Sequence, residues 1–471
     1  MSRARNLADL LDSTGDIKSG ALDNVQSPLT AGVDYLTPTG DGSALTGIDS
    51  GTTTIGNDDT ATYSDGDFFY SSSGFVYRLL NDGTSSSWYS LGDGTKQIVP
   101  ELNAVDTLAA GNSCAFYINK NGELYVIGYN GYGQLGLGHN NNIQEWTKVT
   151  GNVKKVFANG NNTYIIRQDG SLWTTGWNYY GQLGLGDTVD RNEFVKLNIT
   201  NVEKVSPGTH TLILKTDGSV WATGVNNFGQ FGLGDTTDRS SFTQIVSSGA
   251  TDIASGSSAS YYINSSGAVY SCGYNYYGQL GRGNTTNYSS FGATNITSGA
   301  SKLMKSGGSS YHAAVIGTSG QLWTVGNGSY GQNGNGSYNA AGNRSSWTQV
   351  VSSGVVEVEV KGYMTMYLNS SGAIYGCGTG SSGQLGLGTA YDRYASFGLS
   401  NITSGGVSVT STNGTSYVLL DDDTIQSTGN STFYQLGDGT NTQRNSFGSA
   451  NVPDAVGSDQ TASNKTVDEL A

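Results

Sequence analysis

Short apolar runs alternate with polar turns along most of the chain. In a representative stretch, Tyr164 to Arg167 and Leu172 to Thr175 flank the pair Asp169-Gly170. Asp-Gly between two apolar runs favours a two-residue hairpin turn. After a polar segment come a further apolar run, Phe194 to Leu197, and a strand-like run, Val202 to Val205. The pattern therefore predicts about four short strands in every stretch of roughly fifty residues.

A glycine-rich landmark recurs at the same interval. The string Gly-Gln-Leu-Gly-Leu-Gly, or a close variant of it, begins at Gly133, Gly181, Gly229, Gly278, Gly331 and Gly383. Degenerate copies at Tyr89 and Tyr434 flank this set. A hairpin signature precedes each landmark, so hairpins and landmarks agree on eight copies of one repeat.

A four-stranded unit of this size has an apolar face that it cannot bury alone. Copies must stack around an axis as a β-propeller or along a line as a solenoid, and the strand count and period favour the propeller. The landmark glycines suit tight turns beside a neighbouring blade, and Leu135 and Leu137 suit the space between blades. We predict an all-β propeller at residues 60–455, preceded by a linker at 27–59 and followed by a polar tail at 456–471.

Composition narrows the functional classes. The 471 residues include 70 glycines and 5 prolines, and only 13% are charged, with a net charge of −14. This acidity, without a cluster of Lys and Arg, argues against nucleic-acid binding. No apolar stretch is long enough to span a membrane, so we predict no membrane insertion. Cys114, Cys272 and Cys377 are too few for a disulfide framework, and at least one is free.

Three copies carry a family resemblance. The stretches Leu124 to Gly138, Leu172 to Asp187 and Val220 to Asp235 resemble the RCC1 repeat, named for the regulator of chromosome condensation. The resemblance implies a seven-bladed propeller with one blade closed by strands from both chain ends, whereas we count eight copies. Either the propeller has eight blades, or one terminal copy, the first by preference, is degenerate and completes a blade. Such propellers serve nucleotide exchange, ultraviolet sensing, inhibition and scaffolding, so the resemblance implies fold more than function.

Residues 1–26 belong to no repeat. Leu7, Leu10 and Leu11 have helical spacing and predict a short amphipathic helix whose apolar side needs a partner. The segment resembles the beginnings of fibre-like structural proteins of marine tailed phages (cyanophage type), and residues 27–59 resemble their Gly/Thr/Ser-rich linkers. This resemblance implies that the three leucines anchor the chain in a virion. Without it, a disordered leader is the simpler interpretation.

Candidate catalytic and metal-binding patterns have simpler structural explanations. Gly131 to Gly136 satisfies G-x-G-x-x-G, but no helix pattern follows it. Asp187 and Arg191, which recur in the next copy, predict an Asx turn with a neighbouring ion pair rather than a cation or sugar site. His210 and His312 lack ligand spacing and suit structural roles. We predict no catalytic residue, no cofactor and no metal site.

The loops before the landmarks combine aromatic rings with Asn, Ser and Gly. Such loops make a binding surface at a low cost in side-chain entropy, and sugars suit them. The candidate binding residues are Tyr132, Trp177, Tyr179, Tyr180, Phe228, Tyr276, Tyr277 and Tyr330. Asn333 and Asn335 join them because they replace the usual leucines, which makes that blade edge either wetter or a partner contact. In the alternative interpretation, at least half of the rings pack between blades.

The resemblance of residues 1–26 to phage structural proteins implies a non-enzymatic virion protein of the tail-fibre, adhesin or decoration type, made in the cytoplasm of a host bacterium. The first segment would bind other virion proteins, and the propeller would bind a host surface glycan or protein. Several copies, including a homo-oligomer, would add avidity. The alternative is a soluble interaction module that acts as an inhibitor or scaffold. A polysaccharide-cleaving enzyme would need convergent carboxylates, which the sequence does not place together.

Overall fold

The computed structural model describes residues 68–70, 76–81, 86–90, 107–305 and 310–452. The chain divides into two compact units, residues 1–99 and residues 100–471. In the first unit, an antiparallel sheet has the order β1-β2-β3, with β1 (Phe68–Tyr70), β2 (Val76–Asn81) and β3 (Ser86–Ser90). The predicted helix with Leu7, Leu10 and Leu11 lies outside the described residues.

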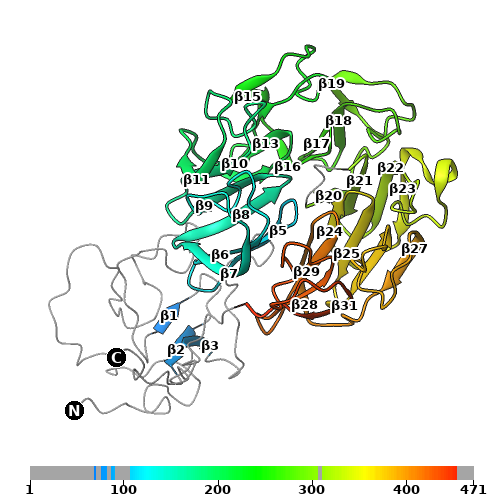
Figure 1. Ribbon diagram of the computed structural model, residues 1–471. Coiled ribbons are helices and arrows are strands. Elements are labelled where there is room, and N and C mark those ends of the chain that lie inside the picture. Colours follow the sequence, from blue (N-terminus) through cyan, green and yellow to red (C-terminus); the bar gives the residue numbers. More distant parts are fainter. Residues whose placement is uncertain (1–67, 71–75, 82–85, 91–106, 306–309, 453–471) are drawn as a thin grey trace, which may run out of the picture. The chain divides into compact units, whose positions relative to one another are not determined.

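The second unit is a propeller of seven four-stranded antiparallel sheets, each built from four consecutive strands. In Figure 1 the chain passes around the ring from cyan through green and yellow to red. Blade 1 contains β4 (Leu108–Ala110), β5 (Cys114–Ile118), β6 (Leu124–Gly128) and β7 (Ile143–Thr150). Blade 2 contains β8 (Val153–Asn159), β9 (Asn162–Arg167), β10 (Leu172–Gly176) and β11 (Arg191–Lys196). Blade 3 contains β12 (Val202–Ser206), β13 (His210–Lys215), β14 (Val220–Gly224) and β15 (Arg239–Val246).

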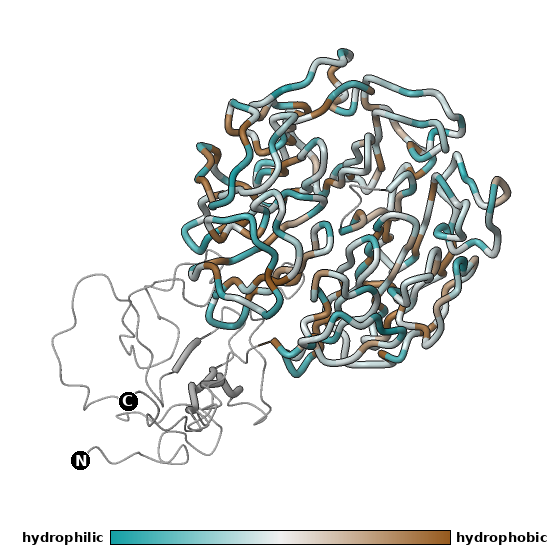
Figure 2. The backbone as a smooth tube through the Cα atoms, viewed as in Figure 1, coloured by the Kyte–Doolittle hydropathy of each residue, from teal (hydrophilic) through white to brown (hydrophobic). Residues whose placement is uncertain are grey.

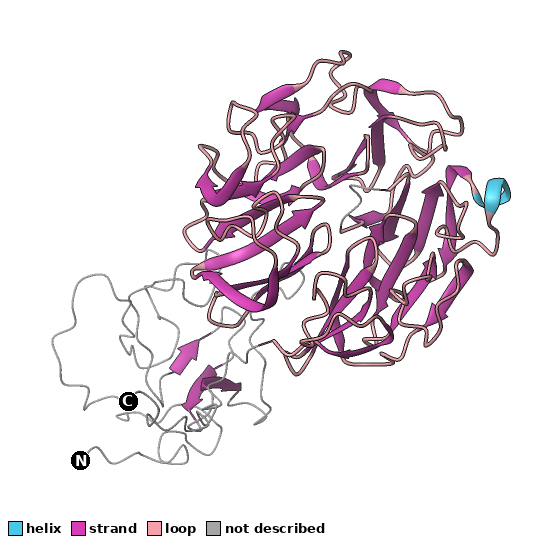
Figure 3. Ribbon diagram, viewed as in Figure 1, coloured by secondary structure: helices cyan, strands magenta, loops and turns pink. Residues whose placement is uncertain are grey.

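Blades 4 to 7 repeat this order. They contain β16 (Ala250–Ser255), β17 (Ala259–Asn264), β18 (Val269–Gly273), β19 (Tyr288–Ala293); β20 (Ala300–Leu303), β21 (His312–Gly317), β22 (Leu322–Gly326), β23 (Arg344–Val351); β24 (Val355–Lys361), β25 (Met364–Asn369), β26 (Ile374–Gly378), β27 (Tyr394–Leu399); β28 (Gly406–Ser411), β29 (Thr415–Leu420), β30 (Ile425–Gly429) and β31 (Arg444–Ser449). Figure 3 shows strands and loops throughout the described propeller and one short 3-10 helix, η2 (Asn339–Gly342).

The strand pattern expected from the sequence is present in each blade. The inner strands are buried along nearly their whole length, and the outer strand is mostly exposed or half-buried, as in β9 and β11. The second residue of each third strand is half-buried, and in six blades it is aromatic. These aromatic residues, which share one packing position, are Tyr125, Trp173, Trp221, Tyr270, Trp323 and Tyr375.

The hydrophobic core is distributed between the blades and is not gathered at one centre. One cluster joins Tyr164 and Phe157 of blade 2 to Val205 and Ile213 of blade 3. Other clusters join other neighbouring blades in the same way. Figure 2 accordingly shows brown apolar segments recurring around the whole ring. Each blade therefore buries its faces against two neighbours, which is what a unit with an unburied apolar face requires.

The landmark is the device that connects one blade to the next. The amide of Gly186 donates a hydrogen bond of 2.8 Å to the carbonyl of Ser240, in the outer strand of the next blade. Gly184 has φ of +74°, and a Cβ built on it would lie 2.2 Å from the Phe242 ring. Glycine is required at this position by both its backbone conformation and the close approach of the ring. The landmark therefore has the packing role that the sequence predicts.

The propeller has seven blades, which settles the choice between seven and eight. The first repeat copy forms the separate sheet β1-β2-β3 and contributes no strand to the seven described blade sheets. The expectation that this copy completes a blade is therefore wrong. Ring closure instead joins two complete blades, because Trp146 Nε1 of blade 1 donates a 2.9 Å hydrogen bond to the carbonyl of Ala450, just after blade 7.

Candidate binding face

One end of the propeller carries all the loops that the sequence marks as candidates. In a four-stranded antiparallel blade, successive connections alternate between the two ends. The turn between the first and second strands and the long loop between the third and fourth strands therefore share one end. We call this end the loop face.

Buried asparagine and glutamine side chains hold the long loops in place. In blade 2, Asn178 Oδ1 accepts the amide of Leu183 at 2.9 Å, and its Nδ2 donates to the carbonyl of Asp187 at 3.0 Å. Gln182 Oε1 accepts the amide of Tyr180 at 2.9 Å. The same glutamine contact recurs in every blade. The aromatic residues of the loop face are thus carried on a rigid backbone.

The acidic pairs of these loops have the structural role that the sequence predicts. Asp187 Oδ1 accepts the amide of Val189 at 2.9 Å in an Asx turn, and Arg191 donates to Asp187 Oδ2 at 2.6 Å. The amide of Val189 and the Arg191 guanidinium hold the pKa of Asp187 below its usual range. Asp190 accepts the amide of Asn178 at 2.7 Å. These carboxylates are engaged within their own loop.

Aromatic rings form a chain across blades 7, 1 and 2 of the loop face. The ring centroids of Phe433 and Tyr129 lie 5.2 Å apart, and those of Tyr132 and Trp177 lie 6.0 Å apart. Tyr129 and Tyr132 contact each other within their loop at 6.3 Å. Trp177 then stacks on Tyr179 at 6.3 Å. Each step between blades is a contact between a ring at the end of one loop and a ring at the start of the next.

A second set of rings covers blades 3 to 6. Phe228 lies 4.8 Å from Tyr274, which stacks on Tyr276 at 6.4 Å. Further contacts pair Tyr277 with Tyr311 at 5.4 Å and Tyr330 with Tyr363 at 4.7 Å. Tyr311 and Tyr363 stand in turns between first and second strands. The sequence pattern does not reveal these two residues, because only the blade topology brings their turns to the same end as the long loops.

The predicted binding residues differ in accessibility. Tyr179 and Tyr276 are 66% and 67% exposed, which makes them the most accessible rings of the predicted set. Tyr132, Tyr180 and Phe228 are exposed to about half that extent, and Trp177, Tyr277 and Tyr330 are half-buried. The structure therefore brings the predicted aromatic residues to one face, where they contact each other as well as solvent. Their role in binding stays a prediction.

Asn333 does not belong to this surface. It is fully buried, and its Nδ2 donates to the carbonyls of Gly326 and Gly342 at 3.0 and 2.9 Å. Asn335 is half-buried and also donates to the Gly342 carbonyl, at 3.2 Å. The two asparagines hold the longer loop that contains η2. A polar residue was needed here to support the loop, which explains the loss of the usual leucines.

The first strands of neighbouring blades line the axis, where propeller enzymes gather their carboxylates. Asp252 is bound by Lys204 at 2.5 Å and by the amide of Leu303 at 2.7 Å. Glu357 accepts the amide of Val409 at 2.8 Å and lies 3.5 Å from Lys305 Nζ. These carboxylates are neutralised or hydrogen-bonded by adjacent blades. Within the described residues, no group of three or more His, Cys, Asp or Glu side chains could hold a metal ion.

The buried histidines and cysteines have structural surroundings, as expected. His210 Nε2 lies 2.9 Å from Ser260 Oγ, and His312 Nε2 lies 2.8 Å from Thr365 Oγ1, in each case across a blade junction. The three cysteines are free and buried, and burial raises the pKa of the Cys114 thiol to about 12. No described helix has the length and apolar character needed to cross a bilayer.

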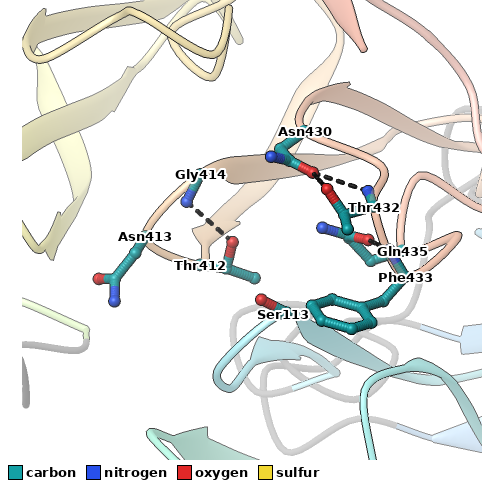
Figure 4. A pocket seen from close by; sticks show the side chains of 8 residues that line it. All are labelled: Ser113, Thr412, Asn413, Gly414, Asn430, Thr432, Phe433 and Gln435. Carbon is teal, nitrogen blue, oxygen red and sulfur yellow. Dashed lines mark hydrogen bonds between the residues drawn. The ribbon is translucent and has the colours of Figure 1, made fainter. Parts of the chain in front are cut away.

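A pocket of about 260 Å³ opens on the loop face beside blade 7. Figure 4 shows the residues that line it, which come from the turn between β28 and β29, the loop after β30 and the turn before β5. They are Ser113, Thr412, Asn413, Gly414, Asn430, Thr432, Phe433 and Gln435. None of them carries a charge, and none of them belongs to the binding residues predicted from the sequence.

Comparisons with known proteins agree with this architecture. The Regulator of chromosome condensation (RCC1) repeat matches at residues 153–182, 208–230 and 250–279, and a second description of the same repeat matches at 169–212 and 266–294. The chain therefore carries RCC1 repeats within an RCC1-like, seven-bladed propeller. No curated protein sequence matches it.

Solved structures share the fold at low sequence identity. Human WBSCR16 is 18% identical with a TM-score of 0.61, and the match covers 70% of this chain and 94% of that one. Yeast RCC1 (Prp20), solved with Kap60 bound, is 16% identical with a TM-score of 0.60, covering 69% and 83%. Prp20p from Saccharomyces cerevisiae is 17% identical in a second structure, with a TM-score of 0.55, covering 64% and 79%.

Proposed function

We propose that the propeller is a non-catalytic protein-interaction module that binds its partner with the loop face. The observation that carries this proposal is the exposure of Tyr179 and Tyr276 at 66% and 67%, each stacked on a further ring. Tyr and Trp are enriched at protein interfaces, where they supply large contact areas and most of the binding energy. Large exposed rings on a rigid loop favour a binding surface over packing.

The repeat and the charge support the same class of partner. Yeast RCC1 (Prp20) was solved with Kap60 bound, and the second structure concerns the binding of Prp20p to Gsp1p and histones. Those partners belong to the yeast protein, and they support only the class of function here. The net charge of −14 favours a protein partner over a nucleic acid. Hydrogen-bonded loops lose little conformational entropy on binding, which favours affinity.

The test compares the two ends of the propeller. The double substitution Tyr179→Ala and Tyr276→Ala removes the most exposed predicted rings, and Leu399→Ala removes a side chain, 47% exposed, at the opposite end of β27. Full-length bait protein is cross-linked in host lysate, and captured proteins are quantified by mass spectrometry. We expect at least a tenfold loss of the specific partner with the double variant and no loss with Leu399→Ala. Equal capture by all three proteins would contradict a role for the loop face.

We further propose that the module is carried on a virion, with host attachment as its task. This proposal is supported by the resemblance of residues 1–26, with Leu7, Leu10 and Leu11, to phage structural proteins, and these residues lie outside the described part of the chain. Mass spectrometry and antibody labelling of purified phage particles test it. We expect the full chain on particles and its loss after deletion of residues 1–26. Abundant free protein in the lysate with none on particles would leave the soluble module.

A further inference from the structure

One junction of the loop face lacks both rings of a bridging pair. At the residue that follows the last glycine of the third strand, blades 1, 2 and 4 carry Tyr129, Trp177 and Tyr274. Blade 7 carries Asn430 there, and blades 3, 5 and 6 also lack a ring at this position. The loop of blade 6 ends in Ser382 where other loops end in an aromatic residue. The junction between blades 6 and 7 therefore lacks both rings of the pair that bridges other junctions.

A pocket lies beside blade 7, where its loops meet the turn before β5 of blade 1. Asn430, Thr432 and Gln435 reach the pocket from the loop after β30, and Thr412 and Asn413 reach it from the turn before β29. The size of about 260 Å³ lies just below the range for small-molecule sites, roughly 300 to 1,000 Å³. The pocket can hold a ligand of about the size of one sugar ring.

The polar groups of the pocket are fixed and still have hydrogen-bonding capacity. Asn430 Oδ1 accepts the amide and the hydroxyl of Thr432 at 2.7 and 2.6 Å, which orients the side chain. Gln435 Oε1 accepts the amide of Phe433 at 2.7 Å. The side-chain nitrogens Asn430 Nδ2 and Gln435 Nε2 have no hydrogen-bond partner among the described residues. These side chains therefore present N–H donors on a frame that is already ordered.

Hydroxyl and amide groups complete the opposite side. Thr412 Oγ1 accepts the amides of Gly414 and Thr415 at 3.1 and 2.9 Å, so the proton of its hydroxyl remains available as a donor. The side chains of Ser113 and Asn413 have no hydrogen-bond partner among the described residues. The lining thus offers both donors and acceptors at short range and no formal charge.

The apolar wall of the pocket is the Phe433 ring. Its other neighbour is Tyr129, 5.2 Å away between centroids, which holds the ring in place. Figure 4 shows the ring beside Ser113, at the edge of the opening. A pyranose has C–H groups on its face, which suit the negative face of an aromatic ring, and hydroxyl groups on its edge, which suit amides.

We propose that this pocket binds a single neutral sugar residue, with Phe433 beneath the ring face and Asn430, Asn413 and Gln435 bonded to ring hydroxyls. The absence of charge in the lining selects a neutral sugar over a sialylated, sulfated or phosphorylated one, because an anion would meet no cation there and an acidic protein around it. The site is separate from Tyr179 and Tyr276, and it extends beyond the proposed interaction with a protein.

The experiment uses saturation-transfer NMR on the full chain with glucose, galactose, mannose and N-acetylglucosamine, each at millimolar concentration, and with glucuronate as the anionic comparison. Asn430→Tyr restores the residue that blades 1 and 4 carry and fills the pocket without a foreign side chain. Asn413→Ala removes an amide that has no described partner. The matched control is Asn227→Tyr, because blades 2 and 4 carry Tyr179 and Tyr276 at that exposed position.

We expect at least one neutral sugar to bind with a dissociation constant of about 1 mM. Asn430→Tyr should abolish the signal, Asn413→Ala should weaken binding about three- to tenfold, and Asn227→Tyr should leave it unchanged. The proposal is overturned if none of the four neutral sugars binds, if Asn430→Tyr still binds, or if glucuronate binds better than they do. Protein capture by the loop face is measured separately, with the substitutions of Tyr179 and Tyr276, so a failure of one proposal can be distinguished from a failure of the other.

Discussion

At the scale of single residues, His210 shows how a buried group ties stability to pH. Ser260 Oγ donates its proton to the Gln230 carbonyl at 2.6 Å, so it accepts a hydrogen bond from His210 Nε2–H at 2.9 Å. His210 Nδ1 is buried without a partner. Burial disfavours the charged imidazolium and lowers the pKa of His210 to about 4, and the Ala259 backbone opposes this shift only in part.

The sign of the pH effect follows from this depressed pKa. Between pH 6.5 and about 4 the unfolded chain binds a proton at this histidine that the folded chain does not. The stability that neutral His210 contributes is therefore fully present above pH 6.5. The free energy of unfolding decreases as pH falls, by about 3 kcal/mol near pH 4. We expect urea unfolding of His210→Gln to lose less stability between pH 7 and pH 4.5 than that of the unsubstituted protein.

The exposed residue His139 supplies the control for this prediction. His139→Gln should keep the full acid sensitivity of the unsubstituted protein. If His210→Gln and His139→Gln lose stability equally between pH 7 and pH 4.5, burial of His210 is not a source of the acid sensitivity.

At the scale of the repeat element, the hairpin glycine and the landmark glycine should differ in importance according to what they contact. Gly184 and Gly170 have nearly equal φ angles, +74° and +75°. A Cβ on Gly184 would lie 2.2 Å from the Phe242 ring, whereas a Cβ on Gly170 would have nothing within 4 Å. Gly170→Ala should cost about 1 kcal/mol of backbone strain, and Gly184→Ala about 2 to 4 kcal/mol, because overpacking adds to the strain.

Chemical denaturation of the two variants measures this difference directly, because the conformational cost is common to both. An equal loss of stability in Gly170→Ala and Gly184→Ala would mean that Phe242 moves aside at little cost. It would also mean that the landmark does not fix the spacing between blades.

Features within one repeat could be predicted from the sequence, whereas features that depend on several blades could not. Some features depend on contacts within about fifty residues, so the local sequence pattern predicts them. They are the hairpin at Asp169-Gly170, the glycine landmark and the shared position of Trp173 and Tyr125. The pocket combines two loops of blade 7 with Ser113 of blade 1, and only the closed ring brings these segments together. The hydrophobic pattern predicts which face of a strand is buried, but it does not predict which blade packs against that face.

The same limit explains the count of blades. The strands Phe68–Tyr70, Val76–Asn81 and Ser86–Ser90 have the pattern of a blade, yet they form a sheet of their own. In the propeller, each landmark from Gly133 to Gly383 bonds to the outer strand of the following blade. The degenerate landmark at Tyr434 lacks the leading glycine just as the one at Tyr89 does, yet its copy forms blade 7. Membership of the ring is decided by these contacts between blades, which a single repeat does not show.

At the scale of the whole propeller, the ring is closed by a tryptophan in place of a phenylalanine. Trp146 occupies the outer-strand position that Phe194 and Phe242 occupy in blades 2 and 3, and a Cβ on Gly437 of blade 7 would lie 2.4 Å from Trp146 Nε1. Its hydrogen bond to Ala450 joins the last residues of the ring to the first blade. Because every blade depends on two neighbours, an opening at this one junction exposes the faces of both blades 1 and 7.

Trp347 of blade 5 provides a matched comparison for Trp146. It stands at the same position as Trp146, but its Nε1 is buried without a hydrogen-bond partner. Trp146→Phe should lower the free energy of unfolding by about 1 kcal/mol, because it leaves the Ala450 carbonyl without its donor. Trp347→Phe removes an unsatisfied donor together with some ring volume, and should therefore cost less than Trp146→Phe. Denaturant midpoints of both variants measure these losses of stability. A larger loss of stability for Trp347→Phe than for Trp146→Phe would show that the packing of the tryptophan ring, and not the hydrogen bond to Ala450, closes the propeller.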